Sequence, residues 1–399
     1  METTETFSGS SPLCSNDSSP GPTDPLSNQS ECMKLYHVLS ERERRAIGSI
    51  CFLAGPLTLL ENLLVLGLIV CSRALRKRPS YLFIASIALA DTFASCFYTI
   101  SFLDFHLFQR CDDQAEYLFK LGGVTMSFTA SVGSLLLTAL DRYLCIYQAC
   151  NYKVLMTRGR ALRGLVALWA VTVLLSFLPL MGWRCPTQLQ PPCSRLFPYV
   201  SHLYLASWVS FILLLLLLIV VSYVLILWKA HRHEALVSAL QQGPGPGAGS
   251  GAGMVTQGGQ ARMRMDIHLA RTLGLILLIM VGCWLPALSF MLADVAVMLS
   301  RDQQRAFAFC STLCLVNSSV NPLLYALRCR ELRRELKSVL CQVTERLCAP
   351  CGFGSGAGQE FRGERSNCSL PLDNDDDTNL TGAVLESVSK RVDTAEQRS

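Results

Sequence analysis

Seven long apolar stretches divide this chain and restrict it to one kind of fold. A segment of about 20 mostly apolar residues is long enough to cross a bilayer, and seven stretches reach that length, at residues 47–71, 81–103, 117–140, 165–183, 203–228, 273–299 and 306–327. Only 16% of the 399 residues are charged, whereas a soluble domain carries about 25%. The sequence therefore predicts an all-α membrane protein, a bundle of seven transmembrane helices.

Basic residues are distributed unevenly over the loops that join these stretches. The loops after the first, third and fifth stretches carry most of the Lys and Arg, and the loops between them carry few. Because short cytoplasmic loops are enriched in basic residues, we expect a multi-pass plasma-membrane protein with its N-terminus outside and its C-terminus in the cytoplasm. The net charge of +5 reflects this orientation and gives no support for nucleic-acid binding.

The segments outside the spans have distinct compositions. We expect residues 1–45 to form an extracellular tail glycosylated at Asn16 and Asn28, both in acceptor triplets. The bundle occupies residues 46–327 and includes a flexible Gly/Pro-rich inner loop at 241–260. Residues 342–399, which are acidic and rich in Ser and Thr, are predicted to form a disordered cytoplasmic tail suited to phosphorylation.

An amphipathic pattern follows the last span. Residues 328–341 place their leucines and a valine on one helical face, with Arg and Glu opposite, which is typical of a helix lying along the membrane surface. The cysteines in and after it are candidate palmitoylation sites: Cys341, Cys348 and Cys351. The alternative is a short soluble helix with incidental cysteines.

Five cysteines lie on the predicted oxidising side: Cys14, Cys32, Cys111, Cys185 and Cys193. Cys185 and Cys193 bracket the Pro-rich segment PTQLQPP, so a local disulfide between them is the pairing we expect. The sequence leaves the pairing of the other three open.

Polar side chains inside the spans are costly at bilayer depth and call for a functional or structural reason. Several fall at a similar depth and are predicted to form one network: Asn62, Asp91, Ser131, Asn317 and Asn321. This network could hold a Na⁺ ion or a proton, or tie the helices together through amide bonds. The sequence contains no metal-ligand cluster, phosphate-binding loop or nucleophile with a base, so no cofactor and no enzymatic activity is predicted.

Motifs near the cytoplasmic ends of the spans suggest helices that rearrange. Pro286 removes a backbone hydrogen bond and bends the sixth span beside the bulky Trp284. Asp266, about four turns further in, could pair with Arg142 and hold the inner face closed, or could be a solvated surface charge. The residues assigned to this switch are Asp141, Arg142, Tyr143, Tyr223, Asp266, Trp284, Pro286, Asn321, Pro322 and Tyr325.

The outer halves of the spans are rich in aromatic residues, and the third span has Val124 and Thr125 where a cationic ligand would need an acid. An uncharged aromatic cavity suits a lipophilic ligand, although these rings could equally pack the bundle or face lipid. Lys120, near the outer end of the third span, could reach the membrane surface or bond a polar head group.

These residues together resemble the signature set of rhodopsin-like G-protein-coupled receptors, and within that family the chain resembles the cannabinoid receptors. The set comprises Asn62, Asp91, Asp141-Arg142-Tyr143, Trp169, Cys283-Trp284-Leu285-Pro286 and Asn321-Pro322-x-x-Tyr325. Cannabinoid-type segments include RKRPSYLFI, TRGRAL, LPLMGW and AFAFCSTLCLVNSSVNP. The short N-terminal tail, Leu144-Cys145 and LPLMGW are more similar to the type 2 branch than to the type 1 branch.

The resemblance implies an endocannabinoid-type lipid ligand, inhibitory G proteins that lower adenylate cyclase activity, and arrestin and a receptor kinase at the tail. It implies a disulfide within the second outer loop, with Tyr117 replacing the usual cysteine of the third span, and Phe128 against Trp284 as the activation toggle. The ligand-binding residues assigned are Phe102, Phe105, His106, Lys120, Val124, Thr125, Phe128, Phe197, Tyr204, Trp208, Trp284, Met291, Phe307 and Ser311.

Tyr98 departs from the family pattern, in which phenylalanine is usual, and adds a hydroxyl to an apolar wall. Leu285 likewise replaces a phenylalanine beside the toggle. A receptor for another lipid, such as a lysophospholipid, is the near alternative, although a phosphate would require more than one basic residue in the outer pocket. A channel or transporter is the alternative from a different class, and the apolar outer pocket argues against it.

Overall fold

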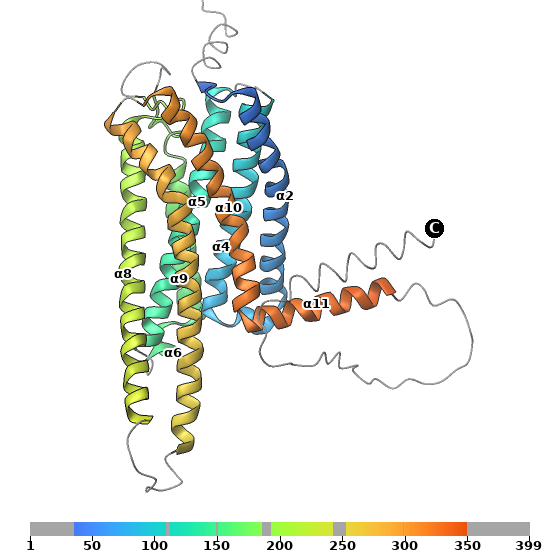
Figure 1. Ribbon diagram of the computed structural model, residues 1–399, viewed down its shortest axis with the longest axis vertical. Coiled ribbons are helices and arrows are strands. Elements are labelled where there is room, and N and C mark those ends of the chain that lie inside the picture. Colours follow the sequence, from blue (N-terminus) through green and yellow to red (C-terminus); the bar gives the residue numbers. More distant parts are fainter. Residues whose placement is uncertain are drawn as a thin grey trace, which may run out of the picture. The chain divides into compact units, whose positions relative to one another are not determined.

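The computed structural model describes residues 36–108, 112–148, 151–185, 193–241, 253–297 and 299–348 (Figure 1). It describes their side chains except those of 230, 233–273, 326–328, 330, 343 and 345–348. The chain divides into two units, Met1–Leu336 and Lys337–Ser399. The helix bundle belongs to the first.

Seven helices in the described residues are long and apolar enough to cross a membrane, which confirms the predicted fold class. Six have continuous bounds: α2 (Glu41–Cys71), α5 (Gln114–Tyr147), α7 (Arg158–Ser176), α8 (His202–Gln241), α9 (Gly253–Ala296) and α10 (Arg301–Arg328). The remaining span is α4 (Pro79–Phe102), which continues as the π-helical turn η1 (Leu103–Leu107). Short helices α3 (Arg73–Arg76) and α6 (Tyr152–Leu155) lie in loops, and α11 (Arg330–Cys348) follows α10.

Local sequence signals determine where several helices begin. Ser40 and Glu43 form a capping box at the start of α2, and Ser300 and Gln303 form another at the start of α10. Asp113 accepts a hydrogen bond from the Glu116 amide at the start of α5. These side chains satisfy backbone N–H groups that the first helical turn leaves without partners.

The fourth span ends earlier than the apolar pattern predicts. Helix α7 stops at Ser176, and residues 177–182 form turns, whereas the apolar stretch continues to residue 183. Pro179 lacks the amide hydrogen that a further helical turn would need. The apolar residues beyond Ser176 therefore lie in the loop that leads to Cys185.

Helix α5 lies at the centre of the bundle, in contact with α4, α7, α8 and α9. Two glycines allow this close packing, because a Cβ atom would lie 2.3 Å from the Phe97 ring at Gly123 and 2.3 Å from Leu168 at Gly133. The main apolar core contains residues of α2, α4, α5, α8, α9 and α10, and includes Trp284 and Tyr325.

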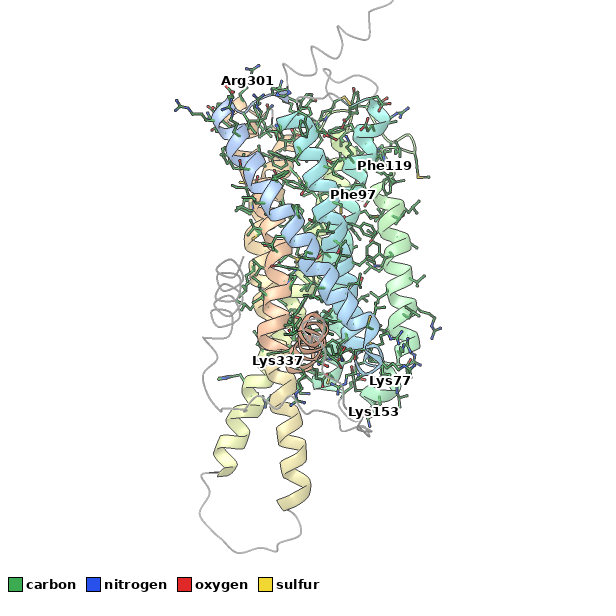
Figure 2. The ribbon with its side chains drawn as sticks, turned by 90° about the vertical axis from the view of Figure 1, so that its right-hand side faces the viewer. Lys77, Phe97, Phe119, Lys153, Arg301 and Lys337 are labelled. Carbon is green, nitrogen blue, oxygen red and sulfur yellow. A yellow bond between two sulfur atoms is a disulfide. The ribbon has the colours of Figure 1, made fainter. Side chains whose placement is uncertain are left out.

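Figure 2 shows Lys77 and Lys153 at one end of the bundle and Arg301 at the other. We call the end with Arg142 the arginine end and the end with the Cys185–Cys193 loop the disulfide end. The first turns of α11 are anchored at the arginine end, because Leu332 is buried, Glu331 pairs with Arg78, and Ser72 donates to Glu335.

Candidate ligand pocket and helix switch

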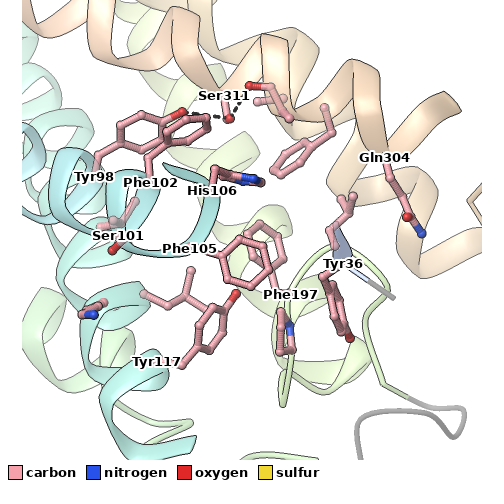
Figure 3. Close-up of a pocket in the computed structure, with 18 of the residues that line it drawn as sticks. Tyr36, Tyr98, Ser101, Phe102, Phe105, His106, Tyr117, Phe197, Gln304 and Ser311 are labelled. Atoms are coloured by element: carbon pink, nitrogen blue, oxygen red, sulfur yellow. Dashed lines mark hydrogen bonds between the residues drawn. The ribbon is translucent and has the colours of Figure 1, made fainter. Parts of the chain in front are cut away.

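An aromatic cavity opens at the disulfide end of the bundle (Figure 3). The space inside it, together with the open space at its mouth, amounts to about 1160 Å³. Most of the assigned ligand-binding residues line it: Phe102, Phe105, His106, Lys120, Val124, Phe197, Trp284, Met291, Phe307 and Ser311. Sequence reasoning did not assign several other lining residues, which include Tyr36, Val38, Asp112, Tyr117, Arg195 and Gln304.

Four of the assigned residues do not line this cavity and are buried behind its wall. Thr125 donates to the carbonyl oxygens of Leu121 and Gly122, and Tyr204 donates to the carbonyl of Leu175. Trp208 donates from Nε1 to Thr129 at 3.1 Å. Phe128 lies against Trp284. In this arrangement these side chains support the wall.

A loop closed by a disulfide supplies one side of the cavity. Cys185 and Cys193 are bonded, as predicted, with 5.9 Å between their Cα atoms. The Cys185 amide donates to the Tyr199 carbonyl at 2.8 Å, and the Tyr36 hydroxyl donates to the Ser194 carbonyl at 3.3 Å. Tyr199 has a φ of 63°, a conformation that side chains with a Cβ rarely adopt. The described part of this loop and the segment before α2 are therefore bonded to each other, and both line the cavity.

Asp294, near the end of α9, holds this loop in place. The residue is 2% exposed, and its carboxylate accepts hydrogen bonds from Ser194 Oγ at 2.5 Å and from the Arg195 amide at 3.2 Å. The Ser194 hydroxyl oxygen in turn accepts from the amides of Leu196 and Phe197. A buried carboxylate needs such donors, so Asp294 positions the part of the loop that faces the cavity. Sequence reasoning missed it.

Lys120 is held by three carboxylates at the edge of the cavity. Its ammonium lies 2.7 Å from Asp104, 2.9 Å from Asp112 and 2.8 Å from Glu116. Burial raises the pKa of the Asp112 carboxyl, while the hydrogen bond and charge of Lys120 oppose this shift. The three acids lie close enough together to hold a metal ion, but Lys120 already supplies their positive partner.

Uncharged polar atoms are scattered along the aromatic wall. The Tyr98 and Ser311 hydroxyls are 3.0 Å apart, and Ser311 also donates to the Ala308 carbonyl at 2.8 Å (Figure 3). Ser101 Oγ and His106 Nδ1 are buried and have no hydrogen-bond partner among the described residues. These atoms are available to orient a ligand that is otherwise apolar.

The base of the cavity meets a pair of stacked rings. Trp284 lines the cavity and lies parallel to Phe128, with 3.4 Å between ring centroids and 17° between ring planes. Trp208 also packs against Phe128, with 5.8 Å between ring centroids and 56° between ring planes. Pro286 lies within α9 two residues beyond Trp284, so a ligand at this depth contacts the helix beside its proline.

Part of the predicted polar network is assembled in the middle of the bundle. Asp91 accepts from Ser318 Oγ at 3.0 Å and from Asn321 Nδ2 at 2.8 Å, and Asn62 Nδ2 donates to the Ser318 carbonyl at 3.0 Å. Asn317 Oδ1 and Ser131 Oγ are buried without a hydrogen-bond partner among the described residues. Ser318, which was not assigned to this network, links Asn62 to Asp91.

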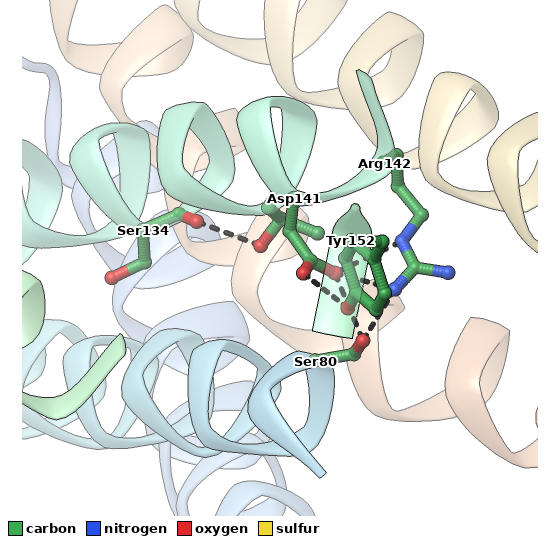
Figure 4. A network of polar contacts seen from close by, with 6 residues as sticks. Ser80, Ser134, Asp141, Arg142 and Tyr152 are labelled. Atoms are coloured by element: carbon green, nitrogen blue, oxygen red, sulfur yellow. Dashed lines mark hydrogen bonds and ion pairs between the residues drawn. The ribbon is translucent and has the colours of Figure 1, made fainter. Parts of the chain in front are cut away.

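A second network surrounds Arg142 at the arginine end (Figure 4). Arg142 bonds Asp141 and the Ser80 hydroxyl, Ser80 donates to Asp141 at 2.9 Å, and Tyr152 donates to the same carboxylate at 2.7 Å. Burial and the charge of Asp141 raise the pKa of Tyr152. Ser80 and Tyr152 are partners that sequence reasoning missed. The side chain of Asp266, predicted to pair with Arg142, lies outside the described side chains.

The remaining switch residues occupy the same end of the core. Tyr223 and Tyr325 are 3% and 0% exposed, and neither hydroxyl has a hydrogen-bond partner among the described residues. Tyr143 stacks on Tyr147 at 4.4 Å, and Lys229 lies 4.0 Å above the Tyr147 ring. Pro322 lies within α10, three residues before Tyr325.

The predicted glycosylation sites Asn16 and Asn28 and the palmitoylation candidate Cys351 lie outside the described residues. So do the three cysteines whose pairing the sequence leaves open: Cys14, Cys32 and Cys111. The side chain of Cys348 is also outside them, whereas Cys341 lies half-buried on α11.

Comparison with known proteins agrees with the geometry. Residues 61–325 match the family described as 7 transmembrane receptor (rhodopsin family). The chain is 47% identical to human cannabinoid receptor 2 over 82% of its length and 86% of the relative's, and 49% identical to the mouse protein over 75% and 82%. It is 44% identical to cannabinoid receptor 1 of Xenopus laevis over 78% and 67%. The chain is therefore a multi-pass membrane receptor and not an enzyme, and it belongs to the cannabinoid receptors within the rhodopsin family.

Proposed function

We propose that this receptor binds endocannabinoid-type lipids in the aromatic cavity and signals through inhibitory G proteins to lower adenylate cyclase activity. The observation that carries the proposal is a cavity lined mainly by aromatic and aliphatic side chains, whose charged groups are engaged with the protein. The names of the relatives, cannabinoid receptors 2 and 1, support the same ligand class.

The charges at the cavity disfavour a lysophospholipid. Lys120 is surrounded by three carboxylates, and Arg195 donates from Nη1 to the Leu299 carbonyl at 3.3 Å. Arg305, the other basic residue near the outer pocket, pairs with Glu43. A phosphate would have to compete with these partners and would face the acids beside Lys120. An uncharged head group avoids that cost.

The stacked rings offer a route from ligand to helix movement. An agonist that displaces Trp284 disturbs its stack with Phe128 and swings the inner half of α9 about Pro286. Opening of the arginine end then releases Arg142 from its partners, with Asp266 among them, and exposes a site for a G-protein helix lined by Tyr223 and Tyr325. The assembled Asp91 network lies between the two sites and could bind Na⁺ or a proton in the closed form.

The concentration of Lys and Arg in the loops after the first, third and fifth spans supports an extracellular N-terminus and a cytoplasmic arginine end in the plasma membrane. This orientation exposes Asn16 and Asn28 to glycosylation, brings Cys341, Cys348 and Cys351 to the membrane face for palmitoylation, and presents the tail to a receptor kinase and arrestin.

Cyclic AMP in cells tests the proposal. Cells that lack cannabinoid receptors are made to express this chain, their adenylate cyclase is stimulated, and a synthetic cannabinoid agonist is compared with a lysophospholipid. We expect the cannabinoid to lower cyclic AMP and the lysophospholipid to have no effect. Lowering by the lysophospholipid alone would contradict the proposal.

A further inference from the structure

A serine hydroxyl joins the two members of the charged pair at the arginine end (Figure 4). Ser80, the second residue of α4, donates to the Asp141 carboxylate at 2.9 Å and accepts a hydrogen bond from Arg142. Both directions are fixed, because an ionised carboxylate only accepts and a guanidinium only donates. Ser80 is half-exposed, whereas Asp141 and Arg142 are buried. Ser80 therefore connects the buried pair to the surface of the molecule.

The residues before Ser80 form a basic run. Residues 76–78 are Arg-Lys-Arg, and only Pro79 separates them from the serine. Lys77 lies exposed at this end of the bundle (Figure 2). Protein kinases select their substrates by the pattern of charges around the acceptor residue, and a basic run before a serine fits a kinase with an acidic substrate groove. Basic residues at this place also orient the span, but orientation gives no reason for a serine beside them.

Given the function proposed above, we propose that Ser80 is a phosphorylation site at which a kinase that selects basic sequences switches the receptor off. The terminal phosphoryl group of a nucleoside triphosphate passes to the serine. The Ser80 oxygen forms a bond to phosphorus, the bond to the leaving diphosphate breaks, and the hydroxyl proton goes to a base of the kinase. The hydroxyl has to leave its partners to reach the kinase, and helix ends are where a helix opens most readily.

The phosphate changes the balance of charges around Arg142. It adds a charge of about −1.5 to −2 and three acceptor oxygens, and Arg142 already bonds the oxygen that would carry it. Asp141 loses the bond donated by Ser80 but keeps those from Tyr152, at 2.7 Å, and from Arg142. Arg142 thus gains charged hydrogen bonds in the closed arrangement, and opening of the arginine end has to break them. Phosphorylation should therefore hold this end closed and leave the cavity at the disulfide end unaltered.

The alternative is that the Ser80 hydroxyl only positions Asp141 and is not modified. To separate these readings, the full-length receptor in lipid nanodiscs is incubated with ATP and the catalytic subunit of a cyclic-AMP-dependent protein kinase, which selects serines after basic residues. Mass spectrometry that localises the phosphate measures the modified fraction of Ser80. After removal of the kinase, nucleotide exchange on an inhibitory G protein measures signalling by a synthetic cannabinoid agonist. Each receptor is compared with its own sample incubated without ATP.

Three variants complete the design. Ser80→Ala removes the acceptor and leaves the basic run. Arg76→Gln combined with Lys77→Gln weakens recognition by the kinase and leaves the Ser80 hydroxyl in place. Ser72→Ala is the matched control, because Ser72 is a half-buried serine of the same loop that follows apolar residues and donates to Glu335.

In the receptor without substitutions we expect Ser80 to acquire phosphate, and the exchange that remains to equal the fraction without phosphate. Antagonist affinity should stay within about twofold of its value before treatment. The double variant should acquire phosphate about tenfold more slowly, and its exchange before treatment should be unchanged. Treatment should have no effect on exchange in Ser80→Ala and should lower it in Ser72→Ala as in the receptor without substitutions. Should Ser80→Ala show no exchange of its own, the double variant supplies the comparison, because its exchange should fall only by its smaller phosphorylated fraction.

No phosphate on Ser80, or phosphate on Ser80 with unchanged exchange, would overturn this inference and leave the proposed function standing. An equal fall of exchange in Ser80→Ala would assign the effect to another residue and overturn it too. Absence of agonist-stimulated exchange in the untreated receptor without substitutions would overturn both.

Discussion

Replacing Asp294 with alanine removes the carboxylate that holds the disulfide-closed loop against the cavity. Two donors lose their acceptor, Ser194 Oγ at 2.5 Å and the Arg195 amide at 3.2 Å. Hydrogen bonds to a charged group contribute about 1.5–3 kcal/mol each, so the loop loses about 3–6 kcal/mol of anchoring.

In Asp294→Ala the loop stays attached to the bundle, because the Cys185–Cys193 disulfide and the backbone hydrogen bond from the Cys185 amide to the Tyr199 carbonyl remain. If the binding arrangement then persists in about a tenth of the molecules, the apparent affinity falls about tenfold. This corresponds to about 1.4 kcal/mol, well within the anchoring lost.

Competition binding on membranes measures this effect. Asp294→Ala is compared with Asp294→Asn, whose amide oxygen still accepts a hydrogen bond, and the number of tracer sites reports folding. We expect a loss of about tenfold for alanine and less than about threefold for asparagine. Unchanged affinity in Asp294→Ala, or equal losses in the two variants, would refute the positioning role.

Three further predictions concern other parts of the molecule. Arg142→Ala should abolish agonist-stimulated nucleotide exchange on the G protein and leave antagonist binding intact; full exchange by this variant would rule out the switch. Burial and the nearby positive charge of Arg44 hold the pKa of His37 below its usual value, so the folded state binds this proton less readily than the unfolded state. The folded state should therefore lose stability as the pH falls below about 6.5. In thermal unfolding scans, Tm should fall less on acidification in His37→Phe than in the unmodified receptor. An equal fall in both proteins would contradict this prediction. Gly123→Ala places a Cβ 2.3 Å from the Phe97 ring and should cost about 1–3 kcal/mol of stability, whereas Gly282→Ala, with no atom within 4 Å of the added Cβ, should leave Tm unchanged; equal Tm values for the two variants would show that the bundle relaxes around the clash.

The sequence was sufficient for features that depend on local pattern. Seven apolar stretches predicted seven spans, and two cysteines eight residues apart predicted the disulfide. The end of α7 was placed too late because apolar residues continue past Pro179, and hydrophobicity alone does not distinguish a span from an apolar turn.

The partners within the site depended on contacts between distant segments. Asp294 meets Ser194 across 100 positions, and Tyr36 reaches the same residue across 158. A periodic pattern of residues along the chain does not indicate contacts between residues so far apart in sequence. Lys120 lines the cavity, as Arg195 also does, and its three carboxylates are brought together by η1, the segment before α5 and the first turn of α5.

For other residues the sequence indicated that an aromatic side chain lies near the cavity but not which way that side chain points. The aromatic pattern placed Tyr204 and Trp208 near the cavity, whereas their polar atoms bond the Leu175 carbonyl and Thr129 in the structure. Which face of a buried helix meets a cavity depends on how neighbouring helices rotate, and a span that is apolar on all sides does not determine this.

Competition binding with two lipid classes tests the central claim most directly. Membranes with the full-length receptor are incubated with a tritiated synthetic cannabinoid, which is displaced with an N-acyl ethanolamide or with a lysophospholipid of the same acyl chain. An aromatic cavity whose charged groups are already paired predicts complete displacement by the ethanolamide and none by the lysophospholipid at the same concentration. Displacement by the lysophospholipid alone would contradict it.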